Sequence, residues 1–222
     1  MLSLVIPTLN EEKNIDNIKN IAKYFHKFQI IIVDGGSSDS TIKKLKKCKF
    51  DIFFSSPNRG KQMRIGAEKS KGKWLLFLHA DCILNMNNVI DIENFLKNKD
   101  KNYVGYFKLK FNSKSIYAVL ISFWANLRTK IFRLPFGDQG LIIGKKEYFS
   151  LGSHKEIKLM EDLDFITRVR FKRKVLLNSY IITSFEKYKK NGIFRQGGKH
   201  LLCQILFFLG IDNETIFKIY KK

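Results

Sequence analysis

The sequence predicts an α/β fold in which a mainly parallel central sheet carries helices on both faces. In residues 1–80, short segments dominated by apolar residues alternate with segments whose apolar residues recur at helical spacing. The strand-like segments do not alternate with polar residues, which is typical of strands covered on both faces. Polar, turn-forming residues follow each of them. These observations predict a β-α-β-α-β-α-β unit whose right-handed crossovers make the strands parallel.

Four strands and three helices are expected in this first part of the chain. The strands are placed at 2–6, 30–33, 50–54 and 74–78. The helices are placed at 15–25, around Ile42 and Leu45, and at 62–69. Asn10 is a candidate cap for the first helix, because Glu11 and Glu12 follow it and acids stabilise a first helical turn.

The second half is less regular, and its pattern predicts a small antiparallel addition to the sheet. Partial alternation at 103–111 indicates an antiparallel strand after a polar, helix-like connection at 85–102. The other expected elements are an apolar, aromatic-rich segment at 116–136, a turn at 137–140, a strand at 141–143, a helix at 161–170, short strands at 175–177 and 181–183, and an apolar helix at 199–209.

The four strands of the first half all end on polar residues. The endings read PTLNEE, DGGSSD, SSPNRG and HADC. Open parallel sheets bind ligands outside the carboxyl ends of their strands, so all four endings are expected to face one crevice. His79 and Asp81 therefore mark the point where a buried strand leaves the core and enters a polar cleft.

Asp34 and Asp39 are the first candidates for chemistry in this cleft. They flank small residues that would let a planar ligand approach the backbone. Asp34 could accept a hydrogen bond from a nucleobase N–H or a ribose hydroxyl. A plain turn in which Asp39 caps the next helix is equally consistent with the pattern.

Asp81 and the acidic segment 161–164 are further candidates. Asp81 could bind a divalent metal that bridges two phosphates, and a loop cap is the alternative. His79 could be another metal ligand, a donor to phosphate or a strand terminator. In the acidic segment, Asp162 could act as a general base. The alternative is that these acids only complement a helix dipole.

The composition bears on the partners and the cellular location of the protein. The net charge is +21, from 41 basic and 20 acidic residues, and indicates an anionic partner or a general lysine bias. We expect no specific nucleic-acid partner, because no nucleic-acid-binding motif accompanies the charge. Three cysteines without a CxxC pair favour a reducing compartment. No signal peptide or apolar run long enough to span a bilayer is visible, so a cytoplasmic location is expected.

Five segments, in this order and spacing, carry a resemblance to a known family: PTLNEE, DGGSSDST, LFLHAD, FGDQGLII and LMEDLDF. From Leu2 to about Gly210 the chain resembles the family 2 glycosyltransferases, and within them a bacterial subgroup with HAD at the metal site. The resemblance implies a GT-A (Rossmann-like) fold, a UDP- or GDP-linked sugar donor, Mg²⁺ or Mn²⁺, and inversion at the anomeric carbon. It implies one domain over 1–222, with a nucleotide-sugar-binding half at about 1–100 and an acceptor and catalytic half at about 101–222.

The resemblance also implies roles for individual residues. Asp162 matches the catalytic base and Asp81 the metal-binding aspartate. The donor-binding residues would be Pro7, Thr8, Asn10, Glu11, Asp34, Gly35, Asp39, Arg59, Gly60, Gln62, Ala80 and Asp81. The acceptor side would comprise Gly137, Asp138, Gln139 and Glu161, and Lys189 and Arg195 would cover the diphosphate. Most of the wider family has an acid where this chain has His79. One carboxylate instead of two should weaken metal affinity or leave the metal held mainly by the diphosphate, and His79 is a candidate replacement ligand.

Other functions fit parts of the sequence. A nucleotidyltransferase can share this fold, but it usually has a glycine-rich loop with Arg or Lys after the first strand, which PTLNEE lacks. A transferase that binds nucleotide without turnover and a charge-driven anion- or RNA-binding protein are the remaining alternatives. Segments 116–136 and 201–209 could contact a membrane surface in plane, and ordinary core packing is the alternative. The acceptor and the oligomeric state are not indicated.

Overall fold

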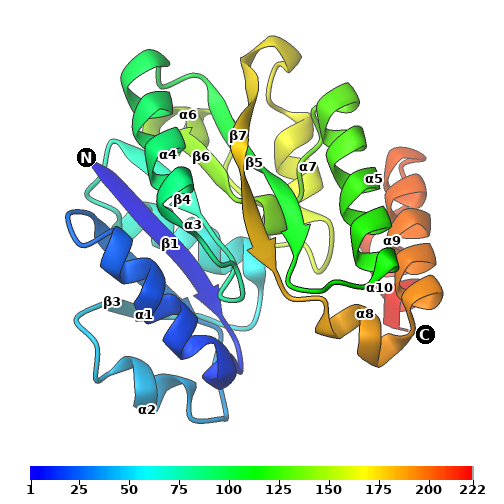
Figure 1. Cartoon of the computed structure of the whole chain (residues 1–222), viewed down its shortest axis with the longest axis horizontal. Coiled ribbons are helices and arrows are strands. Elements are labelled where there is room, and N and C mark those ends of the chain that lie inside the picture. The colour runs from blue at the N-terminus through cyan, green and yellow to red at the C-terminus, as the bar shows by residue number, and fades with distance from the viewer. Residues whose placement is uncertain (222) are drawn as a thin grey trace.

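The computed structural model describes residues 1–221, and its strands form a seven-stranded sheet with the order β3-β2-β1-β4-β6-β5-β7 (Figure 1). The strands are β1 (Leu2–Thr8), β2 (Gln29–Asp34), β3 (Asp51–Phe54), β4 (Trp74–Phe77), β5 (Val104–Phe111), β6 (Leu141–Gly144) and β7 (Lys174–Thr183). β1 pairs in parallel with β2 and β4, and β2 pairs in parallel with β3. The predicted parallel first half is therefore confirmed.

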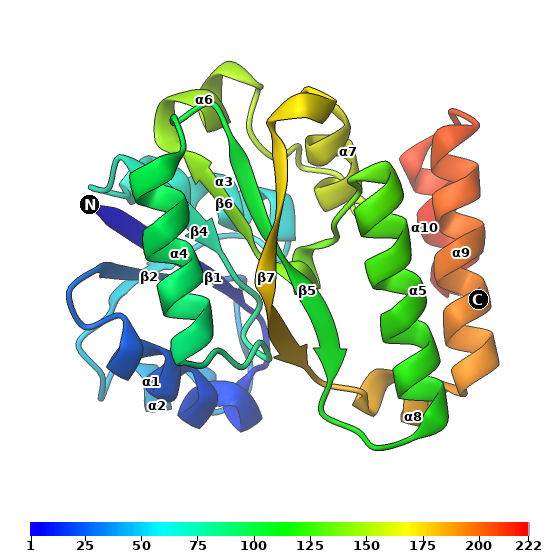
Figure 2. The ribbon, with the colours of Figure 1, turned by 45° about the horizontal axis from the view of Figure 1, so that its top comes forward.

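Both faces of the sheet are covered, which explains why the strands are apolar without alternation. Leu4 and Ile6 of β1 join one buried cluster, whereas Val5 between them joins another. Helices α1 (Ile15–Tyr24), α2 (Thr41–Leu45) and α4 (Met86–Asn98) cover the first cluster. Helices α3 (Arg59–Lys69), α6 (Lys145–Ser150) and α7 (Glu161–Thr167) cover the second. Figure 2 shows the two layers on either side of the strands.

A group of helices extends the molecule beyond the β7 edge. They are α5 (Ile116–Phe132), α8 (Glu186–Asn191), α9 (Ile193–Phe208) and α10 (Asn213–Lys221). Ala118 and Ala125 of α5 pack on Leu109 and Phe111 of β5 in a third buried cluster. Helix α9 lies along the outer side of α5 in both views, with α10 beside it (Figures 1 and 2). Among the described residues, no helix has the length and apolar character needed to cross a membrane.

The reversed strand of the sheet is β6, which confirms the predicted antiparallel addition, and the strand predicted as antiparallel at 103–111 is β5, which is antiparallel only to β6. Strand β6 pairs antiparallel with both β4 and β5, whereas β5 pairs in parallel with β7. The connection from β4 to β5 contains α4, and a helical crossover returns the chain to the same edge of the sheet. Strand β5 therefore runs in the direction of β4.

Strand β7 replaces the two short strands expected at 175–177 and 181–183. Its register against β5 shifts between the pairs Tyr106–Leu176 and Lys108–Tyr180, so β7 contains extra residues there. This bulge contains the polar pair Asn178 and Ser179, which looks like a break in the sequence. Helix α9 also begins earlier than expected, directly after Gly192, whose φ is +83°.

The sheet is continuous across the two predicted halves, because β4 of the first half pairs with β6 of the second. The assignment of one domain with a donor half and an acceptor half stays a prediction. Of its range, residue 222 lies outside the described residues.

Candidate active site

The loops after β1, β2 and β4 meet at one edge of the sheet, as expected for neighbouring parallel strands. Asn17 of α1 holds the loop after β4 in place. Its side-chain amide donates to the carbonyl oxygens of Ala80 and Cys82, at 2.8 and 2.6 Å. The sequence analysis did not single out Asn17, because an asparagine inside an amphipathic helix gives no local signal. These contacts fix the backbone on either side of Asp81.

Asp34 is fully buried, and its carboxylate fastens the loop after β2 to β1. Oδ1 accepts from the backbone N–H groups of Gly36 and Ser37, at 2.9 and 2.8 Å. Oδ2 accepts from the hydroxyls of Thr8 and Ser37, at 2.9 and 2.6 Å. A carboxylate has about four acceptor positions, so all of them are occupied. Asp34 can reach a nucleobase only if a hydroxyl such as that of Ser37 turns away.

The loop after β1 interlocks with the loop after β2. Asn10 adopts a left-handed φ of +56°, and its side-chain oxygen accepts from the N–H of Ser38 at 2.9 Å. Asp39 accepts from the N–H groups of Thr41 and Glu12, at 2.9 and 3.2 Å. Ser40, not Asp39, is the N-cap residue of α2. Asp39 thus supports the start of α2 and the loop of β1 together.

Gln62 and Gly60 set the position of α3 under these loops. The buried Gln62 amide donates to the carbonyl oxygens of Thr8 and Val33, both at 2.8 Å. Gly60 lies against the backbone of Lys155, because a Cβ at this position would be 2.0 Å from the Lys155 carbonyl oxygen. Pro7 is buried within β1, and a Cβ on Gly35 would lie 3.2 Å from Gln62. In this structure these residues hold α3 against the ends of β1 and β2.

Arg59, at the start of α3, joins the donor loops to α7. Its guanidinium donates to Glu161 Oε1 at 3.0 Å and lies 4.0 Å from Asp162 Oδ2. Glu161 is buried, whereas half of the Arg59 side chain is exposed. Residues 102 positions apart in the sequence therefore meet at the cleft.

Asp162 is the central acidic group of the site. Its Oδ2 accepts from the N–H of Gly137 at 3.0 Å, and 18% of its side chain is exposed. Burial, together with the Glu161 carboxylate, raises the pKa of Asp162 to about 7, although Arg59 opposes this shift. A Cβ on Gly137 would lie 2.4 Å from both Asp162 Oδ2 and His79 Nε2. Only glycine therefore lets Asp162 and His79 approach this turn so closely.

A buried histidine and tyrosine lie behind Asp162, and the sequence analysis assigned His154 no role. His154 stacks on Phe165 with ring centroids 4.6 Å apart, and its Nε2 is 3.8 Å from Asp162 Oδ1. The Tyr148 hydroxyl contacts His154 Nδ1 at 2.9 Å and accepts from the His154 N–H at 3.0 Å. Burial lowers the pKa of His154 to about 3, so the ring is neutral. We assign its proton to Nε2, facing Asp162, because Tyr148 can then donate to Nδ1.

Asp81 and its neighbours are the candidate metal ligands. Asp81 Oδ2 accepts from the Thr183 hydroxyl at 2.9 Å. His79 Nε2 and Asp138 Oδ1 are buried without a hydrogen-bond partner in the described structure. Burial, followed by Arg59 and Lys187, lowers the pKa of His79 well below its usual value, so the imidazole is a neutral potential ligand. Burial raises the pKa of Asp138 to about 6, with Asp81 adding to the shift and Arg128 opposing it.

The described residues contain no group of three or more His, Cys, Asp or Glu side chains arranged to hold a metal. A single carboxylate nevertheless fits Mg²⁺ or Mn²⁺ when substrate phosphates supply the other oxygens. Glu11 also belongs to this acidic edge, because burial raises its pKa and the Asp81 charge adds to the effect. The residues present therefore fit a metal held jointly with a diphosphate.

Gln139 and the basic segment border the other side of the cleft. Gln139 is buried, donates to the Phe107 carbonyl at 2.9 Å and accepts from the Thr129 hydroxyl at 3.0 Å. Its side chain therefore anchors the turn and is not presented to a ligand. Lys189 and Arg195 are exposed on α8 and α9. Lys187, which the sequence analysis did not select, is the basic residue of this segment whose charge acts on His79.

Comparison with known proteins finds relatives that match this chain over only part of its length and a small part of their own. The family model of glycosyl transferase family 2 matches residues 3–156. The poly(ribitol-phosphate) β-N-acetylglucosaminyltransferase TarS of Staphylococcus aureus is 28% identical over 105 residues, which are 42% of this chain and 18% of TarS. An uncharacterized glycosyltransferase of Rickettsia bellii is 28% identical over 95 residues, 40% of this chain and 14% of that protein. The matches thus span less than a fifth of these relatives' lengths.

Solved structures share the fold. S. aureus TarS 1–349 in complex with UDP gives a TM-score of 0.64 at 20% identity, over 82% of this chain and 60% of that chain. The mannosyltransferase PcManGT of Pyrobaculum calidifontis, in complex with GDP-Man and Mn²⁺, gives a TM-score of 0.65 at 12% identity, over 91% of this chain and 61% of that chain. The expected α/β GT-A fold is confirmed. The subgroup with HAD and the roles of individual residues stay predictions.

Proposed function

We propose that this chain, which belongs to glycosyl transferase family 2, transfers a hexose-type sugar from a nucleoside-diphosphate sugar to an acceptor hydroxyl with inversion. The observation that carries the proposal is the placement of Asp162. It lies on α7, where its carboxylate accepts from the N–H of Gly137 and lies 4.0 Å from Arg59 at the start of α3, and its pKa is raised to about 7. A general base is most effective when its pKa lies near the working pH. Arg59 connects the donor side to this base, because it pairs with Glu161 and lies close to Asp162.

The chemistry is a single displacement. Asp162 accepts the proton of the acceptor hydroxyl while that oxygen attacks the anomeric carbon from the face opposite the diphosphate. The bond between the anomeric carbon and the diphosphate oxygen breaks, and the diphosphate leaves with the electron pair. The N–H of Gly137 fixes the Asp162 carboxylate through Oδ2, the oxygen that also faces Arg59, while Oδ1 faces the buried His154. Arg59 lies close enough to support the negative charge of the leaving group.

For the donor, we propose a UDP- or GDP-linked sugar. TarS was solved with UDP and PcManGT with GDP-Man, which supports both nucleotides as candidates. The loops that contain Thr8, Asn10, Asp34 and Asp39 would hold the nucleoside, with Asp34 reading the base after Ser37 turns away. The loop at Arg59 would lie near the diphosphate. Lys187 joins Lys189 and Arg195 as a candidate for covering that group.

We propose Mg²⁺ or Mn²⁺ as the cofactor, held by Asp81 with His79 as a further neutral ligand. When bound, the metal would neutralise charge on the leaving diphosphate. PcManGT was solved with Mn²⁺, which supports this choice. On the acceptor side, we assign Gly137, Asp138 and Glu161 to the surroundings of Asp162. Gln139 supports these residues from behind.

The proposal is tested by the release of UDP or GDP from a panel of nucleotide sugars, with and without candidate acceptors. Asp162→Asn should lower turnover at least ~100-fold, the usual contribution of a general base, and leave nucleotide affinity unchanged. Asp164→Asn is the matched control on the same helix, because its carboxylate pairs with Lys155 and Arg168, both at 2.8 Å. Wild-type turnover in Asp162→Asn, or nucleotide binding without release from any donor, would overturn the proposal.

We also propose that the outer face of α5 and α9 contacts an anionic membrane surface from the cytoplasmic side. Phe123 and Trp124 on α5 are 64% and 55% exposed, and Phe194 on α9 is 80% exposed. Apolar side chains gathered on neighbouring helices are typical of a surface with a partner. The net charge of +21 complements anionic lipid, and the three cysteines are free, as a reducing compartment allows.

Flotation with vesicles tests the membrane contact. The wild type should float with vesicles rich in phosphatidylglycerol and not with pure phosphatidylcholine. Phe123→Ser combined with Trp124→Ser should abolish flotation, whereas Met86→Ser combined with Ile90→Ser, two exposed sites on α4, should not. Equal flotation of all variants would refute the assignment. A dimer in light scattering that only the α5 variant disrupts would assign this face to a second copy instead.

A further inference from the structure

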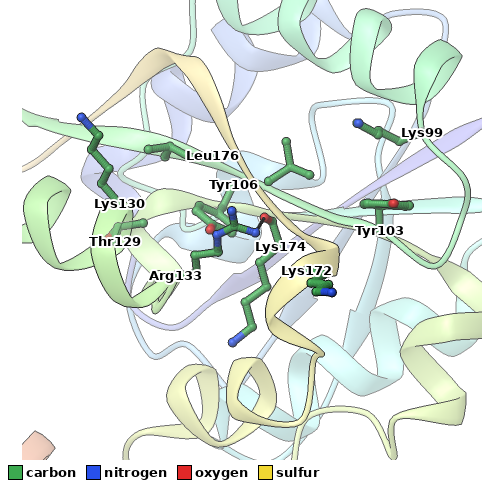
Figure 3. Close-up of a pocket in the computed structure, with 10 residues that line it drawn as sticks. Lys99, Tyr103, Tyr106, Thr129, Lys130, Arg133, Lys172, Lys174 and Leu176 are labelled. Carbon is green, nitrogen blue, oxygen red and sulfur yellow. Dashed lines mark hydrogen bonds between the residues drawn. The ribbon is translucent and has the colours of Figure 1, made fainter.

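A cavity of about 490 Å³ lies near the amino ends of β5 and β7 (Figure 3). Its wall includes Tyr106 and Lys174, near the amino ends of these two strands. Thr183, which contacts Asp81 in the cleft, ends the same strand β7. At about 3.3 Å per residue, the length of β7 separates Lys174 from Thr183 by roughly 30 Å. The cavity therefore lies away from Asp81, although Thr129 in its wall donates to Gln139 behind the turn at Gly137.

The cavity is strongly cationic. Lys99, Lys130, Arg133, Lys172 and Lys174 line it, and no acidic residue does so among the described residues. None of the five takes part in an ion pair within residues 1–221. Lys174 is only 6% exposed, and burial followed by the Arg133 charge lowers its pKa. Uncompensated like charges in a partly buried site repel one another, which a bound anion would relieve.

The guanidinium of Arg133 is fixed in the wall. It donates to the carbonyl oxygens of Phe171 and Lys174, at 2.9 and 3.1 Å, and stacks on the Phe171 ring at 4.5 Å. Both bonds use one nitrogen, Nη1, so other guanidinium N–H groups remain to serve a ligand. A pre-positioned arginine is the side chain best suited to phosphate oxygens.

Tyr106 provides an independent sign of a ligand. Its side chain is fully buried, and its hydroxyl has no hydrogen-bond partner in the described structure. Burial raises the pKa of Tyr106 to about 12, so the group keeps its proton and is a donor. Figure 3 shows this hydroxyl beside Arg133, among the side chains that line the cavity. A buried donor without an acceptor destabilises a protein by about 1–3 kcal/mol, which an incoming oxygen would offset.

We propose that this cavity binds a small molecule or headgroup through a phosphate group, independently of the catalytic cleft. Arg133 and the Tyr106 hydroxyl would bind the phosphate oxygens, and the four lysines would supply the surrounding positive charge. The volume lies within the range of ordinary small-molecule sites and exceeds that needed for a phosphate alone. The phosphate could belong to a soluble phosphorylated metabolite or to an acidic phospholipid.

Calorimetric titration of inorganic phosphate at low ionic strength tests the site. Lys130 and Lys172 are exposed, so Lys130→Gln with Lys172→Gln should leave the fold intact. This pair should weaken phosphate binding at least ~10-fold, and Tyr106→Phe should weaken it by a smaller factor. Lys27→Gln with Lys43→Gln is the matched control, because it removes the same charge from exposed positions elsewhere.

The outcomes distinguish a specific phosphate site from the general attraction of anions to a basic protein. The proposal is overturned if the Lys130→Gln/Lys172→Gln and Lys27→Gln/Lys43→Gln variants weaken phosphate binding equally. It is also overturned if phosphate binding is unchanged both in Tyr106→Phe and in Lys130→Gln/Lys172→Gln. Glycerol 3-phosphate and vesicles that contain phosphatidic acid then identify the source. Binding of the soluble ester assigns a metabolite, and binding only to the vesicles, lost in the Lys130 and Lys172 pair, assigns a lipid headgroup.

Discussion

At the scale of single residues, the site depends on how Asp162 is held. Its neighbours act in opposite directions on its charge, because burial and Glu161 disfavour the carboxylate and Arg59 favours it. The N–H of Gly137 fixes one oxygen, and a neutral His154 lies near the other. A carboxyl group arranged in this way can take up and release a proton near neutral pH.

The raised pKa of Asp162 predicts the pH dependence of activity. The base must be deprotonated to act, so the protonated fraction limits the rate below the folded-state pKa of about 7. We expect kcat/KM to fall about tenfold per pH unit below that value and to level off above it. The measurement is a pH profile of nucleotide release. A flat profile between pH 5 and 8 would contradict the role of Asp162.

His154→Phe should move this profile. The phenyl ring preserves stacking on Phe165 but removes the N–H that faces Asp162, so the carboxylate loses a stabilising dipole and its pKa rises. We expect the acidic limb to shift toward alkaline pH, and Tyr148→Phe to shift it less. Nucleotide affinity serves as the control, since His154 is buried behind the base. An unmoved limb would assign His154 to core packing alone.

Gly137→Ala tests the close approach of the turn to both side chains. The added methyl group would lie 2.4 Å from Asp162 Oδ2 and from His79 Nε2, so one of them must move. We expect turnover to fall at least ~10-fold, because misplacing a catalytic group by an ångström is costly, while the unfolding midpoint changes little. Full activity in this variant would show that the turn adapts and that Asp162 tolerates displacement.

At the scale of elements, α3 links the first two strands to α7. Gln62 bonds the ends of β1 and β2, and Arg59 on the same helix reaches Glu161. Gln62→Leu would remove the donor from two carbonyl oxygens in a buried setting. We expect a loss of about 1–3 kcal/mol in the free energy of unfolding, measured by urea denaturation. No change in stability would mean that these carbonyl oxygens find other donors.

The parallel first half could be predicted because its signals are local. Apolar segments such as LVI and IIIV, each followed by a turn, are sufficient to define β1 and β2. The reversal of β6 and the bulge of β7 could not be predicted in this way. Both depend on which strand lies beside which, and residues 141–144 carry no local sign that they pair with β4.

The candidate site, like the fold, could be predicted where its signals are local and not where they depend on tertiary contacts. Strand endings located Asp34, Asp81 and His79 at one edge, but not the four hydrogen bonds that occupy the Asp34 carboxylate. His154 gave no signal because its partner Asp162 lies on the next helix and Tyr148 on the preceding one. Contacts between a site residue and the side chains that support it arise from tertiary packing, which cannot be read from the pattern of a single sequence.

At the scale of the whole molecule, three features are distributed over the protein, and α5 contributes to two of them. The cleft lies at the carboxyl ends of β1, β2 and β4, and the cationic cavity lies at the amino ends of β5 and β7. The exposed apolar face lies on α5 and α9, beyond the edge of the sheet (Figure 2). Helix α5 carries both the exposed Phe123 and Trp124 and the cavity residue Lys130, so only variants of Asp81 and Asp162 leave the other two regions untouched.

The measurement that tests the central claim most directly is calorimetric titration of UDP and GDP, each with and without Mn²⁺. Wild type and Asp81→Asn should be compared at matched pH. We expect one of the nucleotides to bind in a metal-dependent manner, with Kd raised at least ~10-fold in Asp81→Asn, since one ligand carboxylate is lost. Absence of binding by either nucleotide, with or without the metal, would contradict the assignment of the cleft to a nucleotide sugar.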